Sequence, residues 1–439
     1  MKRYFILLTL GLVFSSGLVK AQEPQEKWDL NTCINYALEH NIQVKKSKVA
    51  LLESQESTKE AKAQLFPSLS ASVTQGFVNY LSTGAISNNS YSGNYSVTAN
   101  LKLFDGGQRV QSIKQQELQD NVQEFGIQQN ENDIEIALTQ NYLQILYAYE
   151  AVKINENTLQ VSDEQRKRGL ELYKAGAIAQ SDYAQLEAQY SSDKYQLVVA
   201  QTNLANYKLA LKQLLELDIT QDIDVVIPQL NESDILVPLP DKESVYRTSL
   251  AVMPEIKSSE LNISIAELQT KKAKGTYWPT ISLNAGIGTG HLSGTDYSYG
   301  SQMWDKFNES IGLTVSVPIF TNRANKTALN QAKLQVITSQ LEHLNAQKEL
   351  LKTVEGIYLD ATSAQTQFLS ASEKLKSVEE SYKLINEQFS LGMKNTLELL
   401  TEKNNLLIAQ QEVLQSKYMA VLNVQLLNFY QDKPIVLKY

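Results

Sequence analysis

A seven-residue repeat of apolar side chains constrains the fold of this chain more than any other feature of its sequence. It lies in the proline-free run from Thr321 to Lys433. Positions seven residues apart carry Val354, Ala361, Phe368, Leu375, Tyr382 and Phe389, and a second series displaced by three residues carries Ile357, Ala364, Ala371, Val378 and Ile385. Both series stay on one face of a helix only if the helix supercoils left-handedly around a neighbour. The sequence therefore predicts a long helix packed along a second helix.

The second helix is predicted from the same chain. Moved back by the separation in sequence between Gly392 and Gly176, the first series falls on Leu138, Ile145, Val152, Leu159, Arg166 and Tyr173. Moved back by the same separation, the second series falls on Asn141, Ala148, Asn155, Ser162 and Gly169. The first of these earlier series begins apolar and then turns polar, and the second is smaller and more polar in the same phase. The chain is therefore interpreted as an internal duplication.

Landmarks outside the two seven-residue series repeat at nearly the same spacing. Leu38 with Leu250 and Pro67 with Pro279 share one separation in sequence, while Phe104 with Phe320 and Gly176 with Gly392 share a slightly larger one. The difference in length falls in the strand pair, mostly in its loop, because loops absorb insertions that frameworks do not.

Residues 1–21 are predicted to be a cleaved secretory signal peptide. Lys2 and Arg3 precede an apolar core from Tyr4 to Val13, and Val19-Lys20-Ala21 forms a small-residue cleavage site. The apolar core is too short to span a membrane. Removal of the three basic residues changes the formal net charge from -8 to -11. An acidic exported protein is not expected to bind nucleic acid.

The cysteine and histidine content and the catalytic motifs searched for give no indication of a disulfide, a metal site or an enzyme active site. Cys33 is the only cysteine, so no intramolecular disulfide is possible, and it does not adjoin the cleavage site, where a lipid-anchor cysteine would lie. We expect it to be a small buried residue of the first helix. The three histidines are dispersed, so no metal site is predicted. No HExxH, GxSxG or Gly-Lys-Ser/Thr phosphate-loop motif is present. We expect neither enzyme activity nor a cofactor.

The first predicted repeat covers residues 22–217. A helix from about residue 28 to 62, capped by Asn31 or Thr32, ends at Phe66-Pro67. Strands are predicted at about 68–81 and 91–104, where apolar residues alternate with Ser, Thr, Asn and Gly. A helix hairpin follows at about 108–217, with its turn at Gly176. The alternation is typical of a strand with lipid on one side and water on the other, and equally of a strand in a soluble sandwich.

The second predicted repeat covers residues 245–431, after a proline-rich connector at 218–244. It contains a helix at 250–274 with Pro254 in its first turn, strands at about 279–290 and 309–320, and a helix hairpin at about 322–430. Residues 432–439 form a C-terminal tail. The loops Leu81–Ser90 and Gly290–Asn308 join the strands at the ends away from the long helices, so we expect them to face the cell exterior.

Four long strands per chain cannot close a transmembrane sheet. Barrels in membranes begin at about eight strands, and an open edge in lipid leaves backbone groups unsatisfied. If the strands enter a membrane, several chains must contribute to one barrel. The same symmetry applied to four long helices per chain gives a closed ring of helices with a water-filled middle.

The ordered landmarks resemble those of the TolC-type outer-membrane efflux channels, the outer-membrane factors of tripartite efflux and type I secretion systems. They are FPSLSAS, LFDGGQR and YKAGAIAQSDY, repeated as WPTISLN, VPIFTNR and FSLGMKNTLEL. The resemblance implies a mainly α protein with transmembrane β structure, forming a homotrimer with a 12-stranded β-barrel in the outer membrane and a 12-helix α-barrel in the periplasm. It also implies a passive exit duct that docks to a periplasmic adaptor (membrane fusion protein) and an inner-membrane RND-, ABC- or MFS-type transporter.

In that family the hairpin ends form a periplasmic tip that the adaptor grips and that closes the channel. The resemblance assigns this tip to Tyr173, Gly176, Ala177, Leu391, Gly392 and Met393. The family's constricting acidic pair falls on Glu398 and Thr401. Its gate network of aspartate, tyrosine and arginine falls on Asp182, Phe389 and Lys394, so the hydroxyl is lost and the guanidinium is replaced by an ammonium, which cannot form the same fork of hydrogen bonds. We expect Asp182 to pair with Lys394. The alternative is that the three charged residues are solvated charges near helix ends.

A second function class is an exported coiled-coil structural protein with an accessory β domain. The signal peptide and the alternating strands favour the exit duct, and dependence of extraction on detergent would separate the two classes. An outer-membrane enzyme or adhesin is a third class, for which the sequence offers neither a catalytic motif nor long recognition loops. The transported cargo has no signature in the sequence.

Overall fold

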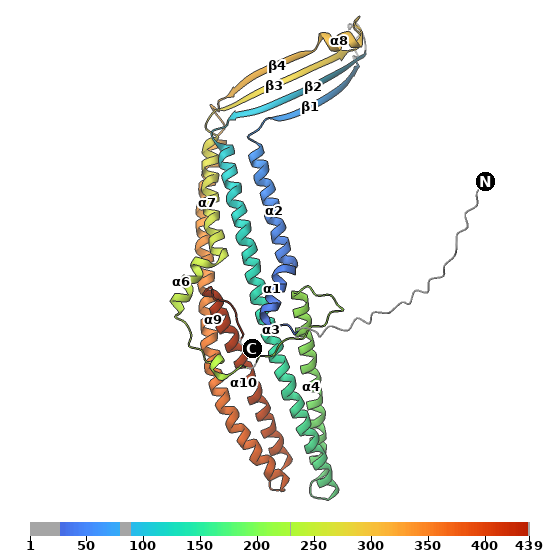
Figure 1. Cartoon of the computed structure of the whole chain (residues 1–439), viewed down its shortest axis with the longest axis vertical. Coiled ribbons are helices and arrows are strands. Elements are labelled where there is room, and N and C mark those ends of the chain that lie inside the picture. Colours follow the sequence, from blue (N-terminus) through green and yellow to red (C-terminus); the bar gives the residue numbers. More distant parts are fainter. Residues whose placement is uncertain (1–26, 80–88, 229, 438–439) are drawn as a thin grey trace, which may run out of the picture.

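The fold is an elongated assembly of helices with a β-sheet at one end and two helix hairpins at the other (Figure 1). The computed structural model describes residues 27–79, 89–228 and 230–437. Two helices, α3 (Gln108–Lys174) and α9 (Ala324–Ser390), have 67 residues each and run from the sheet to the hairpin tips. At ~1.5 Å per residue each is about 100 Å long. A mainly helical chain with a small antiparallel sheet is confirmed.

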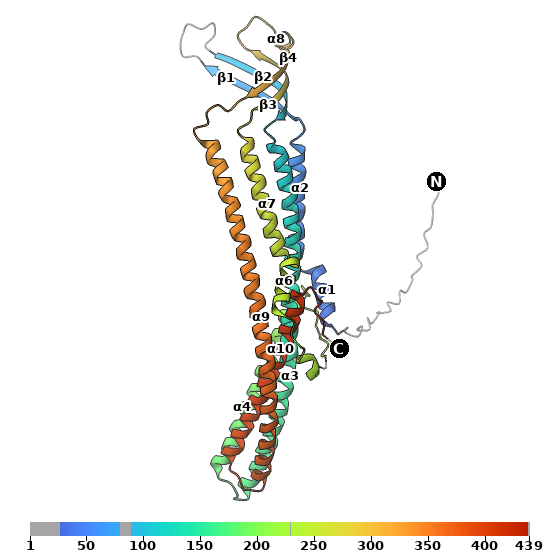
Figure 2. The same cartoon turned by 90° about the vertical axis from the view of Figure 1, so that its left-hand side faces the viewer.

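Shorter helices accompany the two long ones. On the side of the sheet, α2 (Ile42–Ala63) packs along α3 and α7 (Pro254–Gly275) packs between α3 and α9. On the side of the tips, α4 (Gln180–Leu214) packs along α3 and α10 (Thr396–Tyr430) along α9 (Figure 2). None of the described helices is apolar over a stretch long enough to cross a membrane.

Two helices precede the strands in each repeat, which corrects the prediction of one continuous helix at about 28–62 in the first repeat. In the second repeat Pro254 lies in the first turn of α7 as predicted, but a further helix precedes it and begins inside the predicted connector. In the first repeat α1 (Leu30–His40) ends at Asn41, whose φ of -60° and ψ of 134° are extended. In the second, α6 (Lys242–Val252) ends at Met253, with nearly the same angles of -63° and 127°. Asp29, rather than Asn31 or Thr32, caps α1, because its Oδ1 accepts from Thr32 N at 2.6 Å.

Side chains at or near these breaks connect the helices on the side of the sheet to the helices on the side of the tips. Asn41 Oδ1 accepts from Gln43 N at 2.8 Å and so caps α2, while Asn41 Nδ2 donates to Leu214 O at 3.1 Å at the end of α4. In the second repeat, Ser249 Oγ donates to Tyr430 O at 2.7 Å at the end of α10. The break between α1 and α2 is thereby joined to the end of α4, and α6 is joined to the end of α10.

The four strands form one antiparallel sheet in the order β1 (Ser68–Asn79), β2 (Asn89–Phe104), β3 (Thr280–Leu292) and β4 (Asn308–Ser316). The register aligns Leu69 with Ala99, Ala285 and Ile311, and neighbouring positions align Ser70, Thr98, Gly286 and Ser310. One face is therefore apolar across all four strands. The other carries hydroxyl, amide and glycine positions. We call these the apolar face and the polar face.

Strand ends differ from the predicted ranges at several points. β2 begins at Asn89 and not at 91, and β3 covers 280–292 and not 279–290. The predicted strand at 309–320 begins one residue early and ends at Ser316, two residues before Pro318, which cannot donate to a ladder. The end of the first predicted strand, residues 80–81, lies outside the described residues. A short helix, α8 (Tyr299–Asp305), occupies the predicted loop between β3 and β4.

Polar side chains bond across the strands on the polar face. Ser70 Oγ lies 2.9 Å from Thr98 Oγ1, and Ser72 Oγ lies 2.8 Å from Ser96 Oγ. Asn284 connects three strands, since its Oδ1 accepts from Asn100 Nδ2 at 2.5 Å and its Nδ2 donates to Thr314 Oγ1 at 3.2 Å. Ser96 and Asn284 are half-buried and the other residues of this set are exposed, so the polar face is a hydrophilic surface bonded across its strands.

The main hydrophobic core lies at the middle of the molecule, where α1, α3, α6, α10 and the connector meet. Tyr142 is fully buried there, with its hydroxyl 2.6 Å from Val226 O and 3.2 Å from Trp28 O. The connector includes α5 (Glu232–Ile235) and the chain end contributes Ile435. Cys33 is buried as expected, and burial raises the pKa of its thiol to about 12, so the thiol stays protonated and unreactive.

Candidate functional site at the helix-hairpin tips

The two hairpin tips have the same backbone geometry. Gly176 and Gly392 adopt left-handed φ values of 75° and 73°. Ala177 N donates to Leu172 O at 2.9 Å, and Met393 N donates to Gln388 O at 2.9 Å. These bonds satisfy carbonyl groups at a helix end, and glycine is favoured because it has no Cβ. Both tips are therefore sharp, defined turns.

Asp182 and Glu398 cap the helices that leave the tips. Asp182 Oδ2 accepts from Ala179 N at 3.3 Å at the start of α4. At the start of α10, Glu398 Oε2 accepts from Asn395 N at 3.2 Å, and Asn395 Oδ1 accepts from Glu398 N at 2.9 Å. The second arrangement is a complete capping box. Both acidic side chains thus have a structural task at a helix N-terminus.

Lys394 pairs with Glu398 and not with Asp182 within one chain. Its Nζ lies 2.7 Å from Glu398 Oε1, and both side chains are half-exposed. The bond from Lys394, followed by the bond from the Asn395 backbone, lowers the pKa of Glu398. Thr401 is exposed and its Oγ1 donates to Leu397 O at 2.8 Å. The expected Asp182–Lys394 pair is therefore not made inside the protomer.

Phe389 belongs to a small apolar cluster that joins the two hairpins. It is buried with Leu186 of α4 and Leu399 of α10, and Tyr382 packs against them. Gly169 of α3 allows this packing, because a Cβ on it would meet Leu186 Cδ1 at 2.3 Å. Phe389, which stands where the family network has a tyrosine, therefore packs the two hairpins against each other near their tips.

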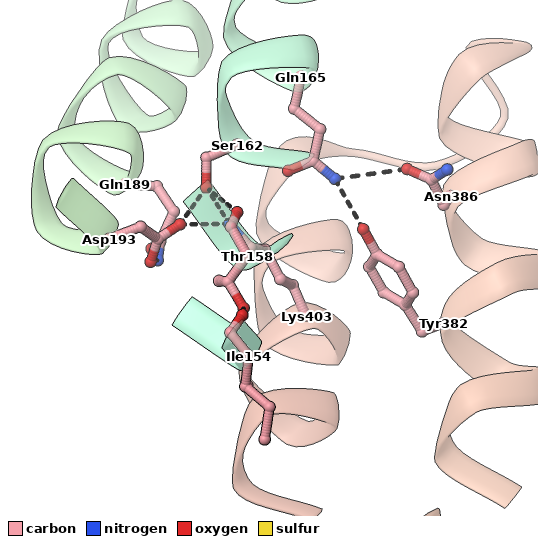
Figure 3. A network of polar contacts seen from close by, with 9 residues as sticks. All are labelled: Ile154, Thr158, Ser162, Gln165, Gln189, Asp193, Tyr382, Asn386 and Lys403. Atoms are coloured by element: carbon pink, nitrogen blue, oxygen red, sulfur yellow. Dashed lines mark hydrogen bonds and ion pairs between the residues drawn. The ribbon is translucent and has the colours of Figure 1, made fainter. Parts of the chain in front are cut away.

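A buried ion pair deeper in the hairpins was not predicted. Lys403 of α10 donates from Nζ to Asp193 Oδ2 of α4 and to Ser162 Oγ of α3 (Figure 3). The Lys403 and Asp193 side chains are only 5% and 4% exposed. Gln189 Nε2 donates to Asp193 Oδ1 at 2.8 Å. We call Ser162, Asp193 and Lys403 the polar node. It connects three helices and both hairpins.

Because Lys403 and Asp193 are buried, loss of either side chain would leave the other as an unpaired buried charge. Removal of the ammonium from water lowers the pKa of Lys403, and the hydrogen bond from Lys403 to Asp193 opposes this change. A buried charge without its partner is strongly destabilising. The sequence offered one signal, since Asp193 lies seven residues after the buried Leu186, on an otherwise apolar heptad position.

A second polar contact joins α3 to α9 beside the polar node. Gln165 Nε2 donates to Tyr382 OH at 3.1 Å and to Asn386 Oδ1 at 3.4 Å (Figure 3). Burial raises the pKa of Tyr382, so its hydroxyl remains protonated. The two hairpins of one chain are therefore tied by the polar node, by Gln165 and by the Phe389 cluster.

The outermost turns expose apolar side chains. Leu391 and Met393 are 75% and 70% exposed, and Leu397 is similarly exposed. On the other tip, Tyr173 stacks on Tyr183 with ring centroids 5.9 Å apart. Ala177 is exposed beside it. Among the described residues, no three His, Cys, Asp or Glu side chains are arranged to hold a metal ion.

The sequence matches a known family twice. The model of the family described as outer membrane efflux protein matches residues 33–216 and again 245–429. The chain is 22% identical over 428 residues to the outer membrane efflux protein BepC of Brucella suis, covering 96% of this chain and 89% of that protein. It is 21% identical to the outer membrane protein TolC of Escherichia coli, covering 95% and 84%. It is 22% identical to the proteases secretion protein PrtF of Dickeya chrysanthemi, covering 95% and 90%.

Solved structures share the fold. CusC superposes with a TM-score of 0.79 at 18% identity, covering 93% of both chains. The CmeC outer membrane channel of Campylobacter jejuni superposes with a TM-score of 0.74 at 18% identity, covering 92% of this chain and 86% of that chain. The shared fold is an elongated one, with a small antiparallel sheet at one end and paired helix hairpins at the other. The chain belongs to the outer membrane efflux protein family.

Proposed function

We propose that this chain is the outer-membrane exit duct of a tripartite efflux or type I secretion system, and that three copies form one closed channel. The observation that carries the proposal is the four-stranded sheet with one apolar face and one polar face, open at both edges. Such a sheet fits lipid on one side and a water-filled lumen on the other.

The open edges support assembly from several chains. β1 and β4 each pair on one side only. In lipid, an unpaired edge leaves backbone groups without partners, so β4 of one copy must pair with β1 of the next. Three copies would supply twelve strands, enough for a closed barrel, whereas one copy falls short of the minimum of about eight.

The edge helices support the same assembly. α9 exposes an apolar stripe made of Leu334, Ile337, Leu341 and Leu344. At the opposite side of the helical layer, α2 exposes Val49 and Leu52 (Figure 2). Contiguous exposed apolar surface marks an interface. In a ring of copies, the α9 stripe of one chain would face α2 of its neighbour, and the helices would enclose a tunnel.

The hairpin tips are proposed as the gate and as the contact for a periplasmic adaptor. Leu391 and Met393 offer exposed apolar contacts, and Glu398 and Thr401 lie on the first turns of α10 beside them. Closure would rest on the Phe389 cluster, on the polar node and on contacts of Asp182 and Lys394 between chains. An inner-membrane RND-, ABC- or MFS-type transporter would supply the energy, because the duct itself is passive.

Export to the outer membrane is part of the proposal. The predicted signal peptide, residues 1–21, lies outside the described residues. Cys33, deep in the core at the middle of the molecule, is not a candidate for lipidation. The names of the relatives cover both efflux and protease secretion, so the proposal does not choose between these two kinds of cargo.

The test is the mass of the protein purified in mild detergent, after the bound detergent is subtracted. We expect a mass of three chains and stable conductance in planar lipid bilayers. A stable folded monomer would refute the assembly. Extraction from cells without detergent would instead favour the exported coiled-coil structural protein.

A further inference from the structure

The segment between β3 and β4 has a defined structure and contains the short helix α8. Gln302 is buried and holds it. Its Oε1 accepts from Leu292 N at 2.8 Å, and its Nε2 donates to Thr295 Oγ1 at 2.9 Å and to Tyr297 O at 3.0 Å. Ser298 Oγ caps the helix by accepting from Ser301 N at 3.2 Å. The helix therefore has a fixed place at the end of the sheet.

That place is on the apolar face of the sheet. Thr289 pairs in register with Tyr95 on this face, and its Oγ1 donates to Met303 O at 2.5 Å. The Tyr299 ring lies 4.6 Å from the His291 ring, and its hydroxyl lies 3.3 Å from Tyr95 OH. Gly93 makes room for His291, because a Cβ there would meet His291 Cε1 at 2.2 Å.

The outer surface of this segment is aromatic. Trp304 is 83% exposed, and Tyr297, Tyr299 and Phe307 are also exposed. Tyr91 of the neighbouring strand β2 is exposed as well, with its ring 5.5 Å from the His291 ring. A second exposed aromatic group lies at the end of the sheet nearest the helices and contains Phe66, Phe104, Tyr277, Trp278 and Phe320. Exposed aliphatic residues such as Leu69, Val73 and Leu313 lie between the two groups.

The spacing of the two aromatic groups fits a lipid layer. β3 spans 13 residues between them. At ~3.3 Å per residue this is about 43 Å along the strand, and about 33 Å across the membrane if the strand tilts by ~40°. Aromatic girdles flank an apolar band about 25 Å tall in membrane-spanning sheets, and Trp and Tyr favour the boundary between lipid and water.

We propose that α8 is a membrane-surface anchor, lying with Trp304 against the headgroup region of the outer leaflet. This inference rests on the proposed function, because it requires the sheet to lie in the membrane. The proposal also states on which face of the sheet the segment between β3 and β4 lies. A segment held on the apolar face lies outside the lumen, so it anchors the sheet at a fixed depth and leaves the polar face of the sheet uncovered.

The experiment uses chains with one tryptophan each, reconstituted in phosphatidylcholine vesicles. Trp28→Phe with Trp278→Phe leaves Trp304, and Trp28→Phe with Trp304→Phe leaves Trp278 as the matched control. Emission is quenched by lipids that carry a nitroxide at the headgroup or in the middle of the acyl chain, and by iodide in the water. We expect headgroup nitroxide to quench both tryptophans more strongly than mid-chain nitroxide or iodide.

A further variant tests the attachment of α8. Gln302→Ala removes the hydrogen bonds of the Gln302 side chain, so it should shift Trp304 quenching from nitroxide to iodide and leave Trp278 quenching unchanged. Trp304 quenched by iodide alone, with Trp278 quenched by lipid, would overturn the anchor and leave the proposed function intact. Failure of lipid nitroxides to quench either tryptophan would overturn the membrane insertion of the sheet itself.

Discussion

Asp182 and Glu398 hold the same position in the two repeats, the third residue of the helix that leaves each tip. Each carboxylate accepts from the backbone N–H of the residue before its helix. Glu398 differs in having a cation, Lys394, at 2.7 Å. The proposed gate charge is therefore also a helix cap, and the two roles need separate tests.

Glu398→Gln separates charge from capping. Glutamine in the third helical position can keep the capping box, so the tip should stay folded while the charge is lost. If Glu398 lines the constriction, the preference for cations in planar bilayers should fall, because acidic rings attract cations. Glu398→Ala, which removes both roles, should lower cation preference and also loosen the tip. Unchanged ion selectivity in both variants would contradict a place for Glu398 at the constriction.

Acid should weaken the cap at Glu398. The ordinary pKa of a glutamate is about 4.5, and that of Glu398 is lowered in the folded chain. A lowered pKa contributes stability that is complete above the ordinary value and is lost as pH falls through the lowered folded value. Single-channel conductance should therefore change below about pH 4.5 in the unmodified protein. The same change in Glu398→Gln would mean that another group titrates.

The polar node should show strong coupling between Lys403 and Asp193. Lys403→Met leaves Asp193 buried without its cation, and Asp193→Leu leaves Lys403 buried without its anion. Each should lower the unfolding free energy by about 3–5 kcal/mol. The double variant should recover most of this loss, because it removes both buried charges and leaves neither of them unpaired. Denaturant midpoints measured in detergent give the four values of the cycle. Additive losses would exclude direct coupling.

Gly169→Ala should destabilise the contact between α3 and α4. The new methyl group would meet Leu186 Cδ1, and Leu186 is held by Phe389 and Leu399. Overpacking of this kind costs about 1–3 kcal/mol. Gly126→Ala in the same helix is the matched control, since nothing lies within 4 Å of a Cβ there, and it should stabilise by roughly 0.5–1 kcal/mol. Thermal unfolding of both variants measures the difference, and equal effects would contradict the packing argument.

The strand loops should be exposed on the cell surface. β1 ends at Asn79 and β2 begins at Asn89, at the end of the sheet away from the helices. An epitope inserted after Asn88, in a segment outside the described residues, should be detected on intact cells because loop tips tolerate insertion. The control is the same epitope after Gly176, which should be detected only after permeabilisation. The reverse pattern would overturn the orientation.

The periodicity of apolar residues and the positions of glycine and proline predicted the long helices and the strand pairs. The buried residues Val354, Ala361 and Phe368 lie on one of the two seven-residue series. The break between α1 and α2 was missed because Ile42 carries no helix-breaking signal, although Pro254 stands at the equivalent position of the second repeat. Alignment of the repeats would have transferred that signal.

The candidate site was predicted less completely than the fold. Family motifs led to Glu398 and Lys394 but not to their capping and pairing, which depend on side-chain geometry at a turn. The polar node carries no motif, because Ser162, Asp193 and Lys403 come from three separate segments. Their proximity depends on how α3, α4 and α10 cross, which heptad spacing does not specify.

The polar node is absent from the other half of the duplication. The second repeat has Val378 and Ala409 at the positions equivalent to Ser162 and Asp193, and the first repeat has Glu187 at the position equivalent to Lys403. In a ring of three copies the six hairpins would look alike in outline but would meet at two kinds of seam. One seam, inside each chain, is fastened by buried charge. The other seam, between chains, would lack this buried ion pair and would be the more compliant. An outward force on the tips would then separate neighbouring chains from one another before it separated the two hairpins of one chain.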